Sequence, residues 1–272
     1  VRIKNFLTYR IAATLQLLIF FFIAVLAYKP VNYMPSDWET NPDFPDDSEW
    51  PAFFHMPVLM LMLITLLNDG TLIAIGYDNV EAREVPEKWN LKVLYLVSSV
   101  LAAVALISSL VLLDVLLRGW QGRGWGKLSY GQITTSIYLK VSISDFLTLF
   151  SARTNENWFW STLPAPILLG AGGCALTLST IIALSWPASS PDGVYTLGLG
   201  RREPYGLFIY IWLYCIGWWF VQDAAKVFTF FLLNKYNLFG YKDTGKLELP
   251  DSTLRYIKEN KEKDMLVKKS GH

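Results

Sequence analysis

Long apolar stretches alternate with shorter polar segments along most of this chain. A helix that spans a bilayer needs about 20 consecutive, mostly apolar residues. Stretches at or near this length cover residues 6–28, 54–77, 93–117, 129–151, 162–186 and 206–233. The pattern therefore predicts an all-α, polytopic membrane protein, with a bundle of six transmembrane helices over residues 1–233 and a polar tail over 234–272.

The connecting segments differ strongly in charge. Residues 29–54 carry six acidic side chains and one lysine, which predicts an irregular, solvated loop. The tail, residues 234–272, holds nine Lys/Arg and six Asp/Glu, and residues 251–267 within it could form a short helix. Lys and Arg gather on the side of both chain ends, with most of the excess in the tail. We therefore expect both ends and the tail to be cytoplasmic and the acidic loop to lie outside.

The overall composition excludes several classes of protein. Hydrophobic residues make up 53% and charged residues 17%, against about 25% charged in ordinary soluble domains. A net charge of +1 gives no support to nucleic-acid binding. Cys174 and Cys215 lie inside apolar runs, so no disulfide framework is expected. The chain begins at Val1, and its first apolar run is too long for a signal peptide, so we expect a piece of a longer protein.

An acidic residue interrupts the second apolar stretch. Asn68, Asp69 and Gly70 stand between two strongly apolar halves, about eight residues or roughly 12 Å from the predicted inner end. Burying a carboxylate at this depth costs at least a few kcal/mol, and intramembrane acids are therefore functional by default. We expect Asp69, with Asn68, to bind and release a proton, and Gly70 to permit local unwinding. The alternative is a capped helix break packed within the bundle.

Two more polar side chains are predicted at a similar depth. Gln16 lies roughly 15 Å along the first predicted helix, and Lys140 lies roughly 16 Å from the inner end of the fourth. We expect Gln16 to hydrogen-bond Asp69, because the first two helices are neighbours in sequence. Lys140 is a candidate counter-charge to Asp69, but it could equally pair elsewhere or with backbone carbonyls. Lys140 and Asp145 are about 140° apart around a helix, so they should not pair directly.

The sixth stretch contains an acid and a base at helical spacing. Asp223 and Lys226 are three positions apart and share one helix face, which predicts a buried structural ion pair. His55 and His272 have no metal-ligand neighbours at useful spacing, so no metal site is expected. The chain contains no P-loop, Gly-x-Ser-x-Gly or His-Glu-x-x-His motif, and we expect no catalytic residue within it.

Several short motifs occur together in this sequence. They read IKNF at residues 3–6, YRIA at 9–12, LNDGT at 67–71, YDNV at 77–80, PEKWNL at 86–91 and LKVSIS at 139–144. Together they resemble the plasma-membrane proton pumps of the P-type ATPase family. The asparagine–aspartate–glycine element is shared, with changes, by calcium pumps, whereas residues 77–80 and 86–91 indicate the proton pumps.

The resemblance implies that the chain is the C-terminal membrane half of such a pump, helices five to ten of ten. It implies an ATP-driven, electrogenic proton exporter of the plasma membrane, with Asp69 at or next to the proton-binding acid. ATP and Mg²⁺ would be bound by the missing nucleotide, phosphorylation and actuator domains, so this chain alone could not hydrolyse ATP. Gln16 falls where plant relatives carry an Arg and fungal relatives a His, which leaves the counter-ion open and adds interest to Lys140.

Three alternatives stay open at this point. The first is the same half of a P-type pump for another cation, although calcium or sodium would need several oxygen ligands. The second is a six-helix secondary transporter, which would need internal repeats that residues 1–128 and 129–233 do not display. The third is a scaffold subunit for which Asp69 is dispensable. The expected partners are the lipid bilayer and the missing half of the pump, with a homo-oligomer left open and no nucleic acid.

Overall fold

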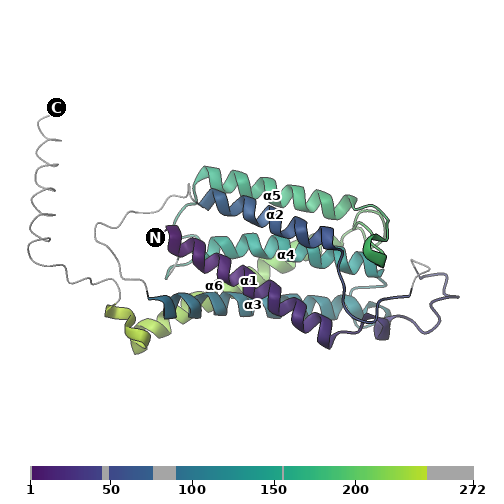
Figure 1. Ribbon diagram of the computed structural model, residues 1–272, viewed down its shortest axis with the longest axis horizontal. Helices are drawn as coiled ribbons and strands as arrows, with labels where there is room; N and C mark the ends of the chain where they lie inside the picture. The colour runs from purple at the N-terminus through teal and green to yellow at the C-terminus, as the bar shows by residue number, and fades with distance from the viewer. Residues whose placement is uncertain (1, 45–48, 76–89, 155, 244–272) are drawn as a thin grey trace, which may run out of the picture.

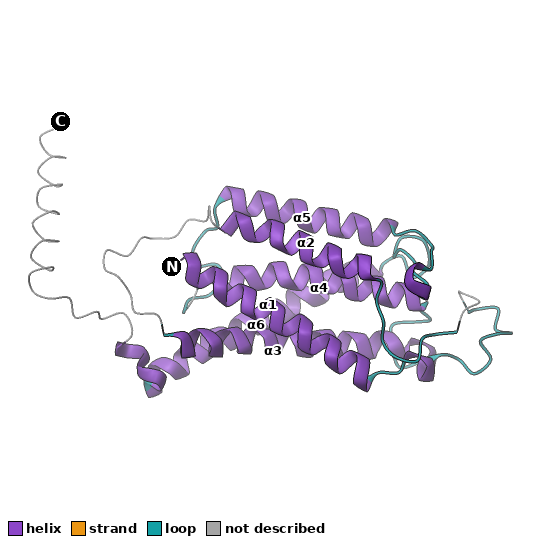
Figure 2. Cartoon of the chain, viewed as in Figure 1, coloured by secondary structure: helices purple, strands orange, loops and turns teal. Residues whose placement is uncertain are grey.

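The computed structural model of the chain describes residues 2–44, 49–75, 90–154 and 156–243. Six long helices and no named β-strand lie within these ranges, which confirms the all-α prediction (Figure 2). The helices are α1 (Arg2–Ala27), α2 (Val58–Ile75), α3 (Leu91–Leu117), α4 (Tyr130–Arg153), α5 (Pro166–Ser185) and α6 (Leu207–Tyr236). Short 3-10 turns are η1 (Pro30–Tyr33), η2 (Arg118–Gln121), η3 (Pro191–Gly193) and η4 (Leu238–Asp243).

Helix α4 is the central element of the bundle. It packs against each of the other long helices, and all of its residues except Ser142 and Phe150 are buried. Its first turn is closed by a capping box, in which Ser129 and Gln132 satisfy each other's backbone N–H groups. Because protein surrounds α4, this helix tolerates the polar side chains that make it the least apolar of the predicted spans.

The other helices form two groups around α4. Helix α1 packs mainly on α3, which also contacts α6, whereas α2 packs mainly on α5 and α4. Figure 1 shows all six running side by side, with the start of α1 and the end of α6 at the same end of the bundle. The ends of consecutive helices therefore alternate between the two ends of the bundle, as a multi-pass chain requires.

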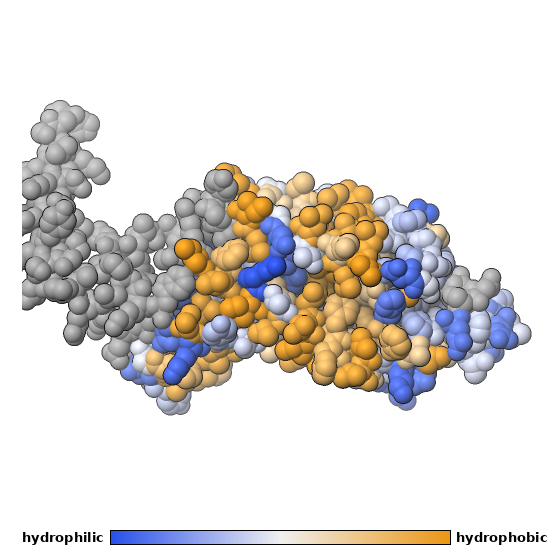
Figure 3. Space-filling model, in the orientation of Figure 1, coloured by the Kyte–Doolittle hydropathy of each residue, from blue (hydrophilic) through white to orange (hydrophobic). Residues whose placement is uncertain are grey.

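Much of the bundle surface is apolar. In the part of the chain that is described, four helical segments are long and apolar enough to cross a membrane. They are Ile3–Ala27, Leu91–Gln121, Pro166–Ser185 and Leu207–Tyr236. Helix α2 contributes a shorter apolar segment, Val58–Gly70. Figure 3 shows hydrophobic atoms over most of one face, with a small hydrophilic group among them. These properties are those of a multi-pass membrane protein.

One prediction about the second helix is wrong. Helix α2 continues through Asn68, Asp69 and Gly70 in α-helical conformation, without the break expected there. A continuous helix keeps its backbone groups hydrogen-bonded, whereas unwinding in apolar surroundings would leave them unsatisfied. The tail helix predicted over residues 251–267 lies outside the described residues, as do most of the tail and the motifs at 77–80 and 86–89.

Candidate ion-binding site

Asp69 lies on α2 and is paired with a cation from α1. Its Oδ1 atom accepts a hydrogen bond from the guanidinium of Arg10. The two side chains are 49% and 42% exposed, so Asp69 is at the surface of this bundle rather than buried as expected. Arg10 is eight residues from the first residue of α1, about 12 Å along the helix axis. The sequence reasoning missed Arg10 as a partner, although an arginine four positions inside an apolar stretch was a usable signal.

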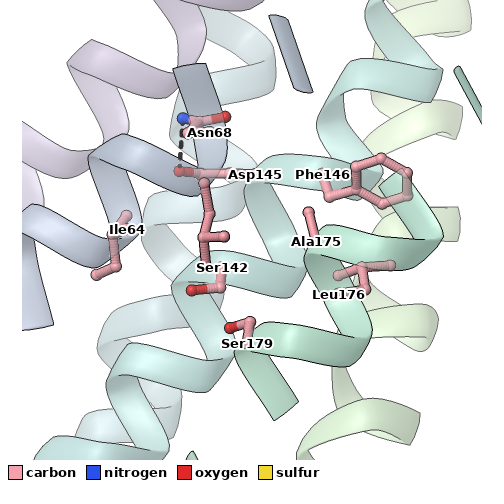
Figure 4. A pocket seen from close by; sticks show the side chains of 9 residues that line it. Ile64, Asn68, Ser142, Asp145, Phe146, Ala175, Leu176 and Ser179 are labelled. Atoms are coloured by element: carbon pink, nitrogen blue, oxygen red, sulfur yellow. Dashed lines mark hydrogen bonds between the residues drawn. The ribbon is translucent and has the colours of Figure 1, made fainter. Parts of the chain in front are cut away.

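Asn68 points to a different side of α2 from its neighbour Asp69. Its Oδ1 atom accepts a hydrogen bond from the hydroxyl of Tyr9, which is buried on α1. Its Nδ2 atom donates to Oδ2 of Asp145 on α4, at 3.3 Å (Figure 4). Successive residues of a helix are about 100° apart, which allows Asn68 to face the interior while Asp69 faces Arg10. The Asn68 amide therefore links α1, α2 and α4.

Asp145 is the buried carboxylate of this region. Asp145 is only 4% exposed, and its Oδ1 atom has no hydrogen-bond partner among the described residues. A small cavity lies against it, between α2, α4 and α5 (Figure 4). The cavity is lined by Ile64, Leu67, Asn68, Ser142, Asp145, Phe146, Ala175, Leu176 and Ser179. The sequence reasoning gave Asp145 no role, although an acid within an apolar stretch was the same signal that selected Asp69.

The hydrogen bond expected between Gln16 and Asp69 is not formed. Gln16 is buried, and neither atom of its amide has a hydrogen-bond partner within the described part of the chain. Gln16 is six residues beyond Arg10 on α1, which places it about 9 Å further along the axis and on another side of the helix. The long side chain of Arg10 reaches Asp69 instead.

Lys140 is fully buried and directed toward α3. Its ammonium donates hydrogen bonds to the carbonyl of Ala105, at 3.0 Å, and to the hydroxyl of Ser109. Of the two alternatives predicted for Lys140, the structure has the one in which it bonds a backbone carbonyl. The cation paired with Asp69 is Arg10 instead. No ion pair joins Lys140 and Asp145 among the described residues, in agreement with their predicted angular separation.

Asp223 and Lys226 form the ion pair expected in α6. Their charged atoms are 2.8 Å apart, and both side chains are fully buried. Lys226 also donates to the carbonyls of Ser151 and Asn157, at 3.0 and 2.8 Å, and Asp223 accepts from the backbone N–H of Phe159 at 3.1 Å. The pair therefore holds α6 to the end of α4 and to the segment after it.

Similarity to known proteins extends over most of the chain. It is 46% identical over 252 residues to "Probable proton ATPase 1B" and to "Probable proton ATPase 1A" of Leishmania donovani, covering 88% of this chain and 25% of each relative. A "Probable plasma membrane ATPase" of Dictyostelium discoideum is 24% identical over 247 residues, or 85% of this chain and 21% of that protein. No protein-family model matches the chain.

The chain spans about a quarter of the length of the two curated relatives from Leishmania donovani. Because the match covers 88% of this chain, it includes most of the helices described above. The resemblance indicated by the short motifs is confirmed by these relatives, because they are named as probable proton ATPases and share almost half of the aligned residues. Over most of its length, this chain is related to the P-type proton ATPases.

Proposed function

We propose that this chain forms the ion-translocating membrane part of an ATP-driven, electrogenic proton exporter of the plasma membrane. In this proposal Asp69 takes up and releases the transported proton. Nucleotide-binding, phosphorylation and actuator domains outside this chain bind ATP and Mg²⁺ and drive the change in proton affinity. The observation that carries the proposal is a carboxylate well inside a helix of a membrane bundle, paired with an arginine of the neighbouring helix.

The pair of Asp69 and Arg10 offers two states of one carboxyl group. When Arg10 is close, its positive charge favours the ionised carboxylate and release of the proton. When the two helices move apart, ionisation of Asp69 becomes more costly and a proton is bound more tightly. Exporting one charge against about 100 mV requires roughly 2.3 kcal/mol before any pH gradient, so a pump needs such a change in proton affinity.

The exposure of this pair supports a partner on the same face. A charged pair that faces lipid is costly, and both side chains are partly exposed in this bundle. In our proposal the remaining membrane part of the pump covers Asp69 and Arg10 and completes the proton pathway. Both ends of the chain face the cytoplasm, which agrees with the excess of Lys and Arg on that side and with the shared end of α1 and α6 (Figure 1).

A P-type pump for another cation is the second candidate. The observation in its favour is that Asn68 and Asp145 bring further side-chain oxygens to the same region of the bundle, and metal cations need several oxygen ligands. A six-helix secondary transporter finds less support, because the relatives from Leishmania donovani are named as probable proton ATPases. The two pump hypotheses differ in the cation that ATP hydrolysis moves.

The experiment uses the full-length pump in sealed vesicles. We expect the variant Asp69→Asn to lose ATP-driven proton transport while it inserts and folds normally. The matched control is Asp114→Asn, which removes an acid of α3 that is paired with Arg118 at 2.8 Å, away from the site. This control should retain transport. Full proton transport by Asp69→Asn would overturn the assignment, and ATP-driven uptake of sodium or calcium in place of protons would favour the second candidate.

A further inference from the structure

Asp145 occupies a position in the bundle that its structural surroundings do not explain. It lies eight residues before Arg153, the last residue of α4, which corresponds to about 12 Å along the helix. This is close to the depth predicted for Asp69 on α2. Protein covers Asp145 almost completely, and no lysine, arginine or histidine among the described residues forms an ion pair with it.

A carboxylate in this environment is poorly compensated. One oxygen accepts a single hydrogen bond of 3.3 Å from Asn68, and the other has no partner in the described part of the molecule. Buried ionic groups in proteins are normally paired or saturated with hydrogen bonds, as Asp223 is by Lys226 and a backbone N–H. Within the same bundle, Asp223 thus has the compensated environment of a structural carboxylate, whereas Asp145 lacks such compensation.

The free oxygen of Asp145 has access to a space for water. The cavity beside Asp145 has room for a water molecule, and the side chains of Asn68, Ser142 and Ser179 on its wall supply polar atoms (Figure 4). A water there could bring a proton to the carboxyl group or remove one. Asp223 has no such neighbour, since its two oxygens bond Lys226 and the Phe159 N–H.

The charged and titratable groups around Asp145 come from several helices. They are Tyr9 on α1 and Lys140 on α4, with the pair of Arg10 on α1 and Asp69 on α2 next to Tyr9 and Asn68 in the chain. The nearest of them in the chain, Lys140, is directed to Ala105 and Ser109 on α3. Arg10 is directed to Asp69. Neither cation therefore neutralises Asp145 by direct contact.

We propose that Asp145 is a second proton-binding carboxyl group of the ion pathway, held against α2 by the Asn68 amide. This inference rests on the proposed function and extends it to a residue on α4. The proton binds at Oδ1 of the carboxylate from a water in the cavity and returns to water when the carboxyl ionises. Asn68 acts as a positioning residue, because its N–H group stabilises the ionised form and its position is fixed by the hydroxyl of Tyr9.

The first test measures protonation of Asp145 without relying on transport. A hydrophobic carbodiimide reacts with protonated carboxyl groups in apolar surroundings, and peptide mass spectrometry locates the adduct in the full-length pump. We expect an adduct on Asp145 that decreases as the pH rises. Asp114, which is ion-paired and partly exposed, is the internal control and should give no comparable adduct. Absence of the Asp145 adduct at every pH would overturn the proposal.

The second test uses the positioning residue. In the variant Asn68→Leu the hydrogen bond to the carboxylate is lost, so the ionised form is less stable. The midpoint of labelling should move upward by about one pH unit or more, the size expected when a hydrogen bond to a charged group is removed. A purely structural role for Asn68 would leave the midpoint unchanged, and that result would contradict the inference.

The third test separates this inference from the proposed function. We expect Asp145→Asn to reduce the protons moved per ATP and to change the pH profile of transport, and Asp145→Glu to restore both. Normal transport by Asp69→Asn, together with labelling of Asp145, would refute the role of Asp69 and leave that of Asp145 standing. An unchanged proton-to-ATP ratio and pH profile in Asp145→Asn would overturn the role of Asp145 alone.

Discussion

Arg10 and Asp69 join two helices that otherwise pack against different neighbours. Helix α1 lies mainly on α3, and α2 lies mainly on α5 and α4, yet the Arg10 guanidinium contacts the Asp69 carboxylate. In water a half-exposed ion pair would contribute at most about 1 kcal/mol. Within a membrane, removing one partner leaves the other charge without compensation and is more costly. The pair is therefore the natural place to test how proton affinity is controlled.

Replacing Arg10 should change the pH dependence of transport. In Arg10→Gln the carboxyl group of Asp69 loses the cation with which it is paired, and its charge is left without compensation. We expect proton transport at neutral pH to fall several-fold and the pH profile of transport to change. Arg10→Lys retains the charge and should keep most of the activity. The measurement is ATP-driven proton transport as a function of pH, and an unchanged profile in Arg10→Gln would contradict the role of the pair.

Replacing Lys140 should change the pH profile of transport less than replacing Arg10 does. Its ammonium bonds Ala105 and Ser109 on α3 rather than Asp69. Lys140 forms no ion pair among the described residues, so its replacement leaves no opposite charge without compensation, and Lys140→Met should keep or raise the melting temperature. The shift in its transport optimum should be smaller than that in Arg10→Gln. A larger shift would restore Lys140 as the main counter-charge to Asp69.

The ion pair in α6 should be important for stability. Lys226→Met leaves the fully buried carboxylate of Asp223 without its cation, which typically costs about 3–5 kcal/mol. Thermal unfolding of the purified pump in detergent should show a clear decrease in melting temperature. The double variant Asp223→Asn and Lys226→Met removes both charges and should recover part of the loss. Equal instability of the single and double variants would argue against an uncompensated charge as the cause.

A contact between two residues outside the long helices, Asp43 and Lys127, can be tested by its dependence on pH. Lys127 donates a hydrogen bond of 2.7 Å to Oδ2 of Asp43, and this bond and the positive charge lower the pKa of Asp43. Because the pKa is lowered on folding, this contact contributes fully above the ordinary pKa of an aspartate and is lost as the pH falls through the lowered value. Carboxyl NMR of the labelled protein should show that Lys127→Gln raises the pKa of Asp43. No change would mean that the contact does not persist in solution.

The pattern of apolar and polar residues was sufficient to predict the number and type of the long helices in the described chain. Whether a stretch of chain can form a membrane helix depends on its own length and apolar content, and these are local properties. The pair of Asp223 and Lys226 could be predicted for the same reason, since residues three apart on a helix always share a face. The family resemblance likewise depended on short contiguous motifs.

Contacts between side chains of different helices could not be predicted in this way and are seen only in the folded bundle. The sequence placed Gln16 and Lys140 at the depth of Asp69, but it did not determine how far each helix is rotated about its axis or which helices are neighbours. Those two properties direct Arg10 to Asp69, leave the Gln16 amide without a hydrogen-bond partner within the described residues, and turn Lys140 toward α3. They also bring Asn68 to Asp145, 77 positions away in the chain. Such contacts depend on the packing of the whole bundle, because no local pattern fixes the rotation of one helix against another.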